Sequence, residues 1–172
     1  MKKIIAIAGR AQSGKSTVAA HLKTRNFTED SFAAPIRKCV AHILGISLTQ
    51  LESCKEQYLG PFDCTPRKMM QTLGTEWGRE MIQNDLWIAS LQERIRHEPT
   101  SIVISDLRFE NEASILRLMG AEIWHIDRPG YIVADSHKSE AGIMQMPHDY
   151  TLVNDGTEDD LRDRADELLV AR

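Results

Sequence analysis

The sequence predicts an α/β protein with three layers, in which helices cover both faces of a central parallel sheet of about five strands. Short apolar runs rich in β-branched residues alternate along the chain with segments of helical periodicity. Such alternation is typical of a parallel sheet wrapped by helices. The length of 172 residues fits one domain with a sizeable core, so we expect a single domain over residues 1–172.

The first third of the chain has clear helix and strand signals. An apolar run, KIIAIAG, ends in Gly9 as a buried strand would, and Pro35 and Gly45 punctuate a later helix. The expected elements are a strand at 3–9, a helix at 15–25, a weaker strand at 27–33, a helix at 35–45 and a helix near 48–58. Pro61 and Pro66 bracket a loop.

The rest of the chain returns to the same alternation after a long helical stretch. Residues 65–99 are expected to form helices interrupted around Gly74 and Gly78. The later expected elements are strands at 101–106, 121–127 and 149–154, a helix at 110–120 and a helix at 157–171 with a capping box from Thr157 to Asp160. The stretch 34–99 is too long for a simple crossover, so we predict a helical insertion there, and a loop that acts as a lid at 128–147.

Composition excludes several classes of function. The net charge of -4 gives no overall basic character for nucleic acid or anionic membrane, and the apolar runs are shorter than a membrane span. Three cysteines without a C-x-x-C pair, and no signal-like start, predict reduced thiols and a cytoplasmic protein. The histidines show no zinc-ligand spacing. We therefore expect neither nucleic acid nor membrane as a partner, and the oligomeric state stays open between monomer and homodimer.

The stretch GRAQSGKST has the spacing of a phosphate-binding loop, G-x-x-x-x-G-K-[ST], between an expected strand and an expected helix. Glycines let backbone N–H groups turn inward around an anion, and the helix points its positive end at the same place. Lys15 would reach the β- and γ-phosphates, and the Ser16 hydroxyl would bind Mg²⁺. The residues expected on the phosphates are Gly9, Gln12, Ser13, Gly14, Lys15, Ser16 and Thr17. The alternative is a tight turn with an accidental Gly-Lys-Ser.

Asp106 is the second candidate for the phosphate site. It follows the apolar run IVIS, where a protein with a phosphate loop places an acid near Mg²⁺. The alternative is an N-cap for the next helix. No N-K-x-D guanine motif occurs in the sequence, which disfavours a GTPase and favours a small-molecule phosphotransferase.

Three internal segments, LGTEWGREMIQNDLW, SDLRFENEA and DSHKSEAGI, resemble those of bacteriophage deoxynucleoside monophosphate kinases. The resemblance extends from the phosphate loop to the NDGT that precedes the last helix. It implies a P-loop kinase fold of the nucleoside monophosphate kinase type, and transfer of the γ-phosphoryl group of ATP to a dNMP with Mg²⁺. ATP and a dNMP would be the partners, in the host cytoplasm if the chain is phage-encoded.

Such transfer depends on positioning and on cationic groups, for which arginine is well suited. Lys15, Asp106, Arg108 and Arg128 are therefore the expected catalytic residues. Candidates for the acceptor are Arg67, Gln71, Trp77, Arg79, Arg10 and Lys138, and Asn154 and Gly156 are expected to pack the adenine through their backbone.

Several of these candidates have a structural alternative. Arg67 and Arg79 would be solvated charges on helix faces, Trp77 would be core, and Arg108 would pair with Glu110 or Glu112. Arg10 would be exposed to solvent, and Trp87 of the first resembling segment is expected in the core. Two other functions also remain open: a P-loop kinase of another small acceptor, such as dephospho-coenzyme A, and a nucleotide-binding module without catalysis.

Overall fold

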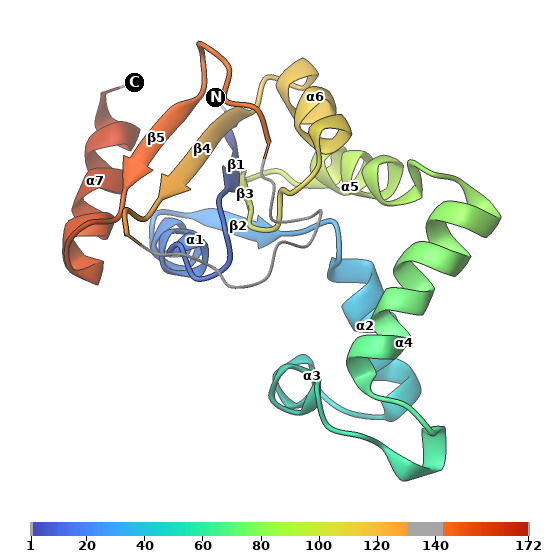
Figure 1. Cartoon of the computed structure of the whole chain (residues 1–172). Coiled ribbons are helices and arrows are strands. Elements are labelled where there is room, and N and C mark those ends of the chain that lie inside the picture. Colours follow the sequence, from blue (N-terminus) through green and yellow to red (C-terminus); the bar gives the residue numbers. More distant parts are fainter. Residues whose placement is uncertain (1, 131–142, 172) are drawn as a thin grey trace. The chain divides into compact units, whose positions relative to one another are not determined.

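The computed structural model describes residues 2–130 and 143–171 (Figure 1). Contacts within the chain divide it into two compact units. The first unit is Met1–Ser31 with Arg94–Arg172, and the second is Phe32–Glu93. The second unit covers nearly the same residues as the expected helical insertion at 34–99, whereas the single domain over 1–172 stays a prediction.

The first unit is built on a five-stranded sheet in which every pairing is parallel, as the sequence predicts. Its strands are β1 (Ile4–Ala8), β2 (Phe27–Asp30), β3 (Ser101–Ile104), β4 (Glu122–Asp127) and β5 (Tyr150–Val153), in the order β2-β3-β1-β4-β5. Ala6 pairs with Ile104, and Ala8 with His125. Because the strands are parallel and in register, the segments that follow β1, β3 and β4 leave from one edge of the sheet.

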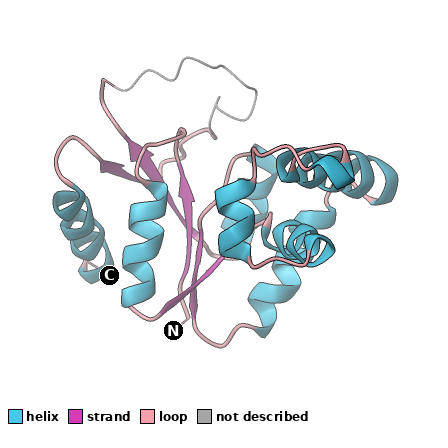
Figure 2. Ribbon diagram, turned by 90° about the horizontal axis from the view of Figure 1, so that it is seen from below, coloured by secondary structure: helices cyan, strands magenta, loops and turns pink. Residues whose placement is uncertain are grey.

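Helices lie on both faces of this sheet, which confirms the three-layer prediction (Figures 1 and 2). They are α1 (Lys15–Thr24), α6 (Glu110–Leu118) and α7 (Glu158–Val170), with the end of α5 (Leu86–His97). Alternate residues of β1, Ile5 and Ile7, pack with Leu22 of α1 and Leu161 of α7 in one apolar core. The predicted capping box of the last helix is present between Thr157 and Asp160. No helix of the described residues is long and apolar enough to cross a membrane.

Two of the expected elements end clearly earlier than predicted, and the other expected strands and helices shift by smaller amounts. The strand expected at 27–33 ends at Asp30, whose carboxylate accepts hydrogen bonds from Arg94 Nε and Nη2 at 2.7 and 3.2 Å. Two hydrogen bonds between charged groups make this a bidentate ion pair at the end of β2. The helix expected near 48–58 ends at Cys54, and a short 3-10 turn, η1 (Gly60–Phe62), follows it.

The named elements of the second unit are all helices or helical turns, and Leu59 and Cys64 form an isolated antiparallel bridge between them. Its elements are α2 (Ala34–Leu44), α3 (Leu48–Cys54), η1, α4 (Pro66–Thr72), the π-helix η2 (Leu73–Ile82) and the start of α5. A small core of Val40, Ala41 and Leu51 joins α2 and α3. All three cysteines are free thiols: Cys39 is exposed, and Cys54 and Cys64 are half-buried.

The expected interruption at Gly74 and Gly78 is wrong, because helical winding continues through both residues in η2. A Cβ at Gly78 would lie 2.5 Å from the Trp87 ring, and the Trp87 indole N–H donates to the Gly74 carbonyl at 2.8 Å. Gly78 therefore allows the close approach of a tryptophan, whereas a Cβ at Gly74 would lie 3.1 Å from the Ile36 side chain.

Candidate phosphate-binding site

The segment between β1 and α1 adopts a conformation that requires glycine. Gly9 and Gly14 have φ of 149° and 110°, and Gln12 lies in the left-handed region with φ of 58°. A Cβ at Gly9 would lie 2.7 Å from the Ile126 carbonyl oxygen, and one at Gly14 would lie 2.8 Å from the Asn154 amide nitrogen. The two glycines of the motif are thus needed for their backbone angles and for close packing, in the strand-to-helix context that the motif requires.

The N-terminus of α1 has the electrostatic character of an anion site. No side chain caps its N-terminus, which follows Gly14, and its first turn contains no acidic residue. The amide groups of this turn and the positive end of the helix therefore favour a negative ligand. The Lys15 ammonium donates to the carbonyl oxygens of Gly9 and Arg10 at 2.7 and 2.6 Å, so its charge lies over the loop. Ser16 is exposed and Thr17 half-buried in the same turn.

Two side chains from neighbouring strand ends contact the loop. Asn154, directly after β5, donates from its amide nitrogen to the Ser13 carbonyl at 2.8 Å. Arg128, directly after β4, donates from Nη1 to the Gln12 carbonyl at 3.1 Å. The Asn154 side chain therefore helps to hold the loop in place, and the expected packing of its backbone on adenine stays a prediction.

Ser13 is the buried polar residue of the loop. It is 3% exposed, and its hydroxyl oxygen has no hydrogen-bond partner among the described residues. A buried polar atom without a partner is costly, and a ligand in the loop is one way to satisfy it. Arg10 is exposed, and Gly156 is an exposed glycine just before the capping box of α7.

The end of β3 brings Asp106 and Arg108 to the same edge of the sheet. Asp106 is half-buried, and it is not an N-cap, because α6 begins at Glu110 with Phe109 as its N-cap. Arg108 is exposed, and its side chain has no hydrogen-bond or ion-pair partner in the described parts of the chain. Of its two expected partners, Glu110 pairs with Arg117 at 3.0 Å, and Glu112 accepts from backbone N–H groups.

The acceptor candidates of residues 65–99 belong to the second unit. Arg67 lies in the first turn of α4 and forms an ion pair with Glu56, and Gln71 is exposed on the same helix. Trp77 is 42% exposed, which excludes the core alternative, whereas Trp87 is buried at 7%. Their ring centroids are 6.3 Å apart, at an angle of 45°. Arg79 is half-buried in η2.

The expected lid is only partly covered by the described residues. Lys138 lies outside the described residues, as does most of the segment expected at 128–147.

Sequence reasoning missed the burial of Glu112, which is only 2% exposed. The available signal was a glutamate two residues into an expected helix, where it can bond the backbone that precedes the helix.

The described residues contain no group of three or more His, Cys, Asp or Glu side chains that could enclose a metal ion. Magnesium at a phosphate site needs only one or two protein ligands, since phosphates and water supply the others. Oxygen ligands suit this ion, and Ser16 and Asp106 provide a hydroxyl and a carboxylate at the carboxyl edge of the sheet.

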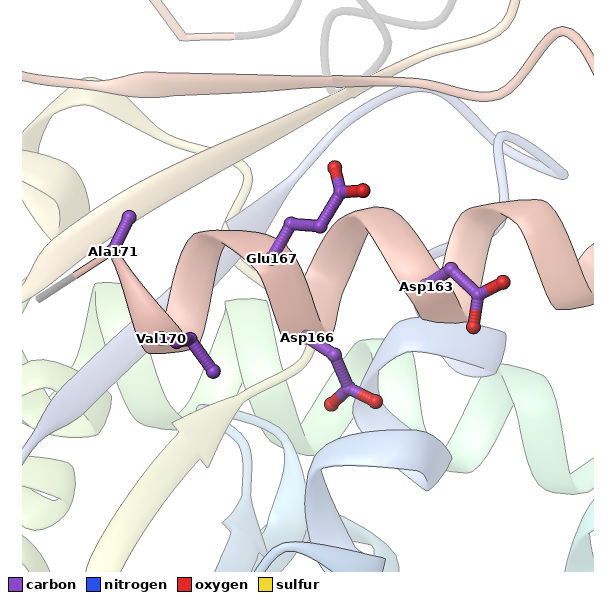
Figure 3. A pocket seen from close by; sticks show the side chains of 5 residues that line it. All are labelled: Asp163, Asp166, Glu167, Val170 and Ala171. Atoms are coloured by element: carbon purple, nitrogen blue, oxygen red, sulfur yellow. The ribbon is translucent and has the colours of Figure 1, made fainter.

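Two surface hollows lie on the helices of the first unit. One is a groove beside the phosphate loop, lined by Ser16, Thr17, Ala20, His21, Thr24, Glu158 and Arg162. The other lies on the C-terminal half of α7, where Asp163, Asp166 and Glu167 project from the helix (Figure 3). Asp166 accepts hydrogen bonds from Arg25 and His21, and the Arg25 bond is the main reason that its pKa lies below the usual value. The carboxylates of this second hollow disfavour a phosphate ligand.

Comparisons with known proteins identify the relatives of the chain. A family model described as deoxynucleotide monophosphate kinase matches residues 62–165. A mimivirus protein provisionally named deoxynucleotide monophosphate kinase, from Acanthamoeba polyphaga mimivirus, is 35% identical over 90% of this chain and 89% of its own length. The deoxynucleoside-5'-monophosphate kinase of Escherichia phage T5 is 34% identical over 58% of this chain, an alignment that spans 43% of the phage protein. The chain therefore matches less than half the length of that phage enzyme.

Solved structures agree on the fold. A Thermus thermophilus protein aligns over 99% of this chain and 97% of its own, with a TM-score of 0.57 and 20% identity. The dephospho-CoA kinase of Campylobacter jejuni aligns over 99% and 96%, with a TM-score of 0.55 and 14% identity. The parallel sheet, the phosphate-loop motif and the match over residues 62–165 together show that the chain belongs to the deoxynucleotide monophosphate kinase family.

Proposed function

We propose that this chain transfers the γ-phosphoryl group of ATP to a deoxynucleoside monophosphate, giving the diphosphate and ADP. The observation that carries the proposal is the loop between β1 and α1, with its two constrained glycines and the Lys15 ammonium over its carbonyls. Membership of the family supports the choice of acceptor. The protein would act in the cytoplasm, which is that of the host cell if the gene is viral. It would act as a monomer or a homodimer.

In this proposal the donor phosphates lie on the amide groups of the loop and of the first turn of α1. Lys15 leaves its two carbonyls to bind the β- and γ-phosphates, and Arg108 and Arg128 stabilise the negative charge of the group in transfer. Asn154 keeps the loop in shape through the Ser13 carbonyl. The acceptor phosphate is already an anion at neutral pH, so no general base is needed, and the rate depends on alignment and charge.

Magnesium fits the proposed site through oxygen ligands. The Ser16 hydroxyl and the Asp106 carboxylate would hold the ion or its water shell, because both belong to segments at the carboxyl ends of β1 and β3. When bound, the ion would neutralise charge on the β- and γ-phosphate oxygens.

The acceptor would be bound by residues of the second unit. Arg67 and Arg79 would hold its phosphate, and Gln71 and Trp77 would contact its base or sugar, with Arg10 and Lys138 as further cations. The exposed Trp77 ring supports this proposal, because an aromatic surface of that kind can stack on a nucleobase.

An ADP-release assay tests the proposed function. The acceptor panel contains the four dNMPs, the four NMPs and dephospho-coenzyme A, each with and without Mg²⁺. We expect ADP release that depends on both a dNMP and the ion. ADP release with dephospho-coenzyme A but with none of the nucleotides would favour a kinase of another acceptor. ATP binding without any acceptor-dependent ADP release would favour a nucleotide-binding module without catalysis.

A further inference from the structure

We propose that Glu112 is a positioning residue that fixes the backbone of Arg108 for phosphoryl transfer, a proposal that rests on the function given above. Glu112 is 2% exposed, although it is a carboxylate at the start of α6. Its Oε2 atom accepts hydrogen bonds from the backbone N–H groups of both Arg108 and Phe109, each at 3.2 Å. The turn that carries Arg108 is thus tied to a buried anchor.

This arrangement differs from the other helix starts of the described structure that have a capping side chain at the third position. Gln50 in α3 and Asp160 in α7 are exposed, and each accepts from the N–H of its own N-cap residue, at 2.8 and 2.7 Å. Glu112 is buried, and it reaches one residue farther, to the N–H of Arg108. An ordinary cap of α6 would need only the bond to Phe109.

The chemistry of the turn favours a role in function over a role in stability alone. Burying a carboxylate is unfavourable unless hydrogen bonds compensate it, and an uncharged cap would avoid that cost. The bonds immobilise the main chain of Arg108, whereas its exposed side chain has no partner in the described parts of the protein. When the main chain of an arginine is fixed in this way, its guanidinium group can bind a phosphate with little further loss of conformational entropy.

A double-mutant cycle in the full chain tests the proposal, with Glu112→Ala, Arg108→Ala and the double variant. If Glu112 acts through Arg108, Glu112→Ala lowers kcat by up to about 10²-fold, as a misplaced catalytic group does. The same change then costs little more kcat in the Arg108→Ala background. ATP affinity stays within a few-fold throughout. Independent, multiplied losses of kcat would overturn the proposal.

The isosteric variant Glu112→Gln provides a second test of the proposal, because both backbone hydrogen bonds go to the same oxygen, Oε2. The Gln carbonyl can take the position of Oε2, so we expect kcat to recover to within about 10-fold of the native value. This variant also keeps the test decisive if Glu112→Ala does not fold. A folded Glu112→Gln protein as slow as Arg108→Ala contradicts a positioning role through these bonds.

Gln50→Ala is the matched control, because it removes the same kind of third-position cap from α3. It should lower the melting temperature slightly and leave kcat unchanged. Amide hydrogen exchange separates the proposal from the assigned activity: Glu112→Ala should speed exchange at Arg108 even if no dNMP is turned over. Unchanged exchange there overturns the anchor itself, whereas native protein without dNMP-dependent ADP release overturns the proposed function.

Discussion

Lys15 is the residue on which the phosphate site depends most. Its ammonium satisfies two loop carbonyls, and in the proposed reaction it exchanges them for phosphate oxygens. Lys15→Ala should therefore lower kcat/KM by about 10²–10³-fold or more, as removal of one charge-stabilising donor does, and leave the fold intact. Steady-state kinetics and a thermal melt measure the two effects.

The matched control is Lys23→Ala on the same helix, where the side chain is 54% exposed and pairs with Glu29 at 3.2 Å. Lys23→Ala should change neither kcat/KM nor the melting temperature. Near-native turnover in Lys15→Ala would contradict the assignment of the loop.

A second single residue, Arg67, tests the proposed binding of the acceptor phosphate. Its guanidinium pairs with Glu56 and is 47% exposed, so little stability depends on it. Arg67→Ala should raise the KM for dNMP about 10-fold or more, because a charge-assisted bond to the acceptor phosphate is lost, and leave the KM for ATP nearly unchanged.

Arg25→Ala is the comparison, since that arginine is 51% exposed and pairs with Asp166 in the first unit. It should alter neither KM. Equal losses of dNMP and ATP affinity in Arg67→Ala would point to a structural role for Arg67.

Among the helices and strands, local patterns predict the sheet well, and long-range contacts explain the errors. The five strands and the loop after β1 follow from short runs and fixed spacings. The contact between Asn154 and Ser13 joins residues 141 positions apart, which no local pattern reveals. Gly74 and Gly78 suggest a helix break from the sequence alone, but the side chains packed closely against them, Ile36 and Trp87, lie elsewhere in the chain.

Gly78→Ala tests this reading of η2. The new Cβ would lie 2.5 Å from the Trp87 ring, which would displace the indole from the Gly74 carbonyl. Overpacking of this kind costs about 1–3 kcal/mol, so the melting temperature should fall by about 2–10 °C. Because Trp77 and Arg79 flank Gly78, the KM for dNMP should rise as well.

Gly60→Ala serves as the control in the same unit, because nothing lies within 4 Å of a Cβ at that position. Its melting temperature should stay close to that of the native protein. An unchanged melt in Gly78→Ala would show that η2 does not depend on close packing with Trp87.

For the whole molecule, the net charge of -4 disfavours nucleic acid but says nothing about a small anion site. The negative charge is partly concentrated on α7, with Glu158, Asp159 and Asp160 in its first turn. The phosphate loop, by contrast, is positive through backbone amides and Lys15, which a sum of charges does not show. The spacing of the motif therefore predicts the binding site better than the overall composition does.

Acid stability should depend on Asp149, a carboxylate that links separate parts of the first unit. Its side chain is 3% exposed and binds Arg117 of α6 at 2.6 Å, His125 of β4 at 3.1 Å and the Met146 N–H at 2.9 Å. Burial by itself raises the pKa of Asp149, but these bonds outweigh it and hold the pKa below the usual 3.8. Arg117 also pairs with Glu110 on its own helix.

The direction of the pH effect follows from that lowered pKa. The stabilisation is complete above the usual pKa of 3.8, which applies in the unfolded chain, and it is lost as the pH falls through the lower folded value. Asp149→Asn should cost about 1–3 kcal/mol of unfolding free energy at pH 7 and flatten the loss of stability below about pH 4. Urea unfolding from pH 7 to pH 2.5 measures both effects. Asp163→Asn, an exposed site on α7, should leave the curve unchanged. If Asp149→Asn keeps the steep acid limb of the native protein, other carboxylates control acid unfolding.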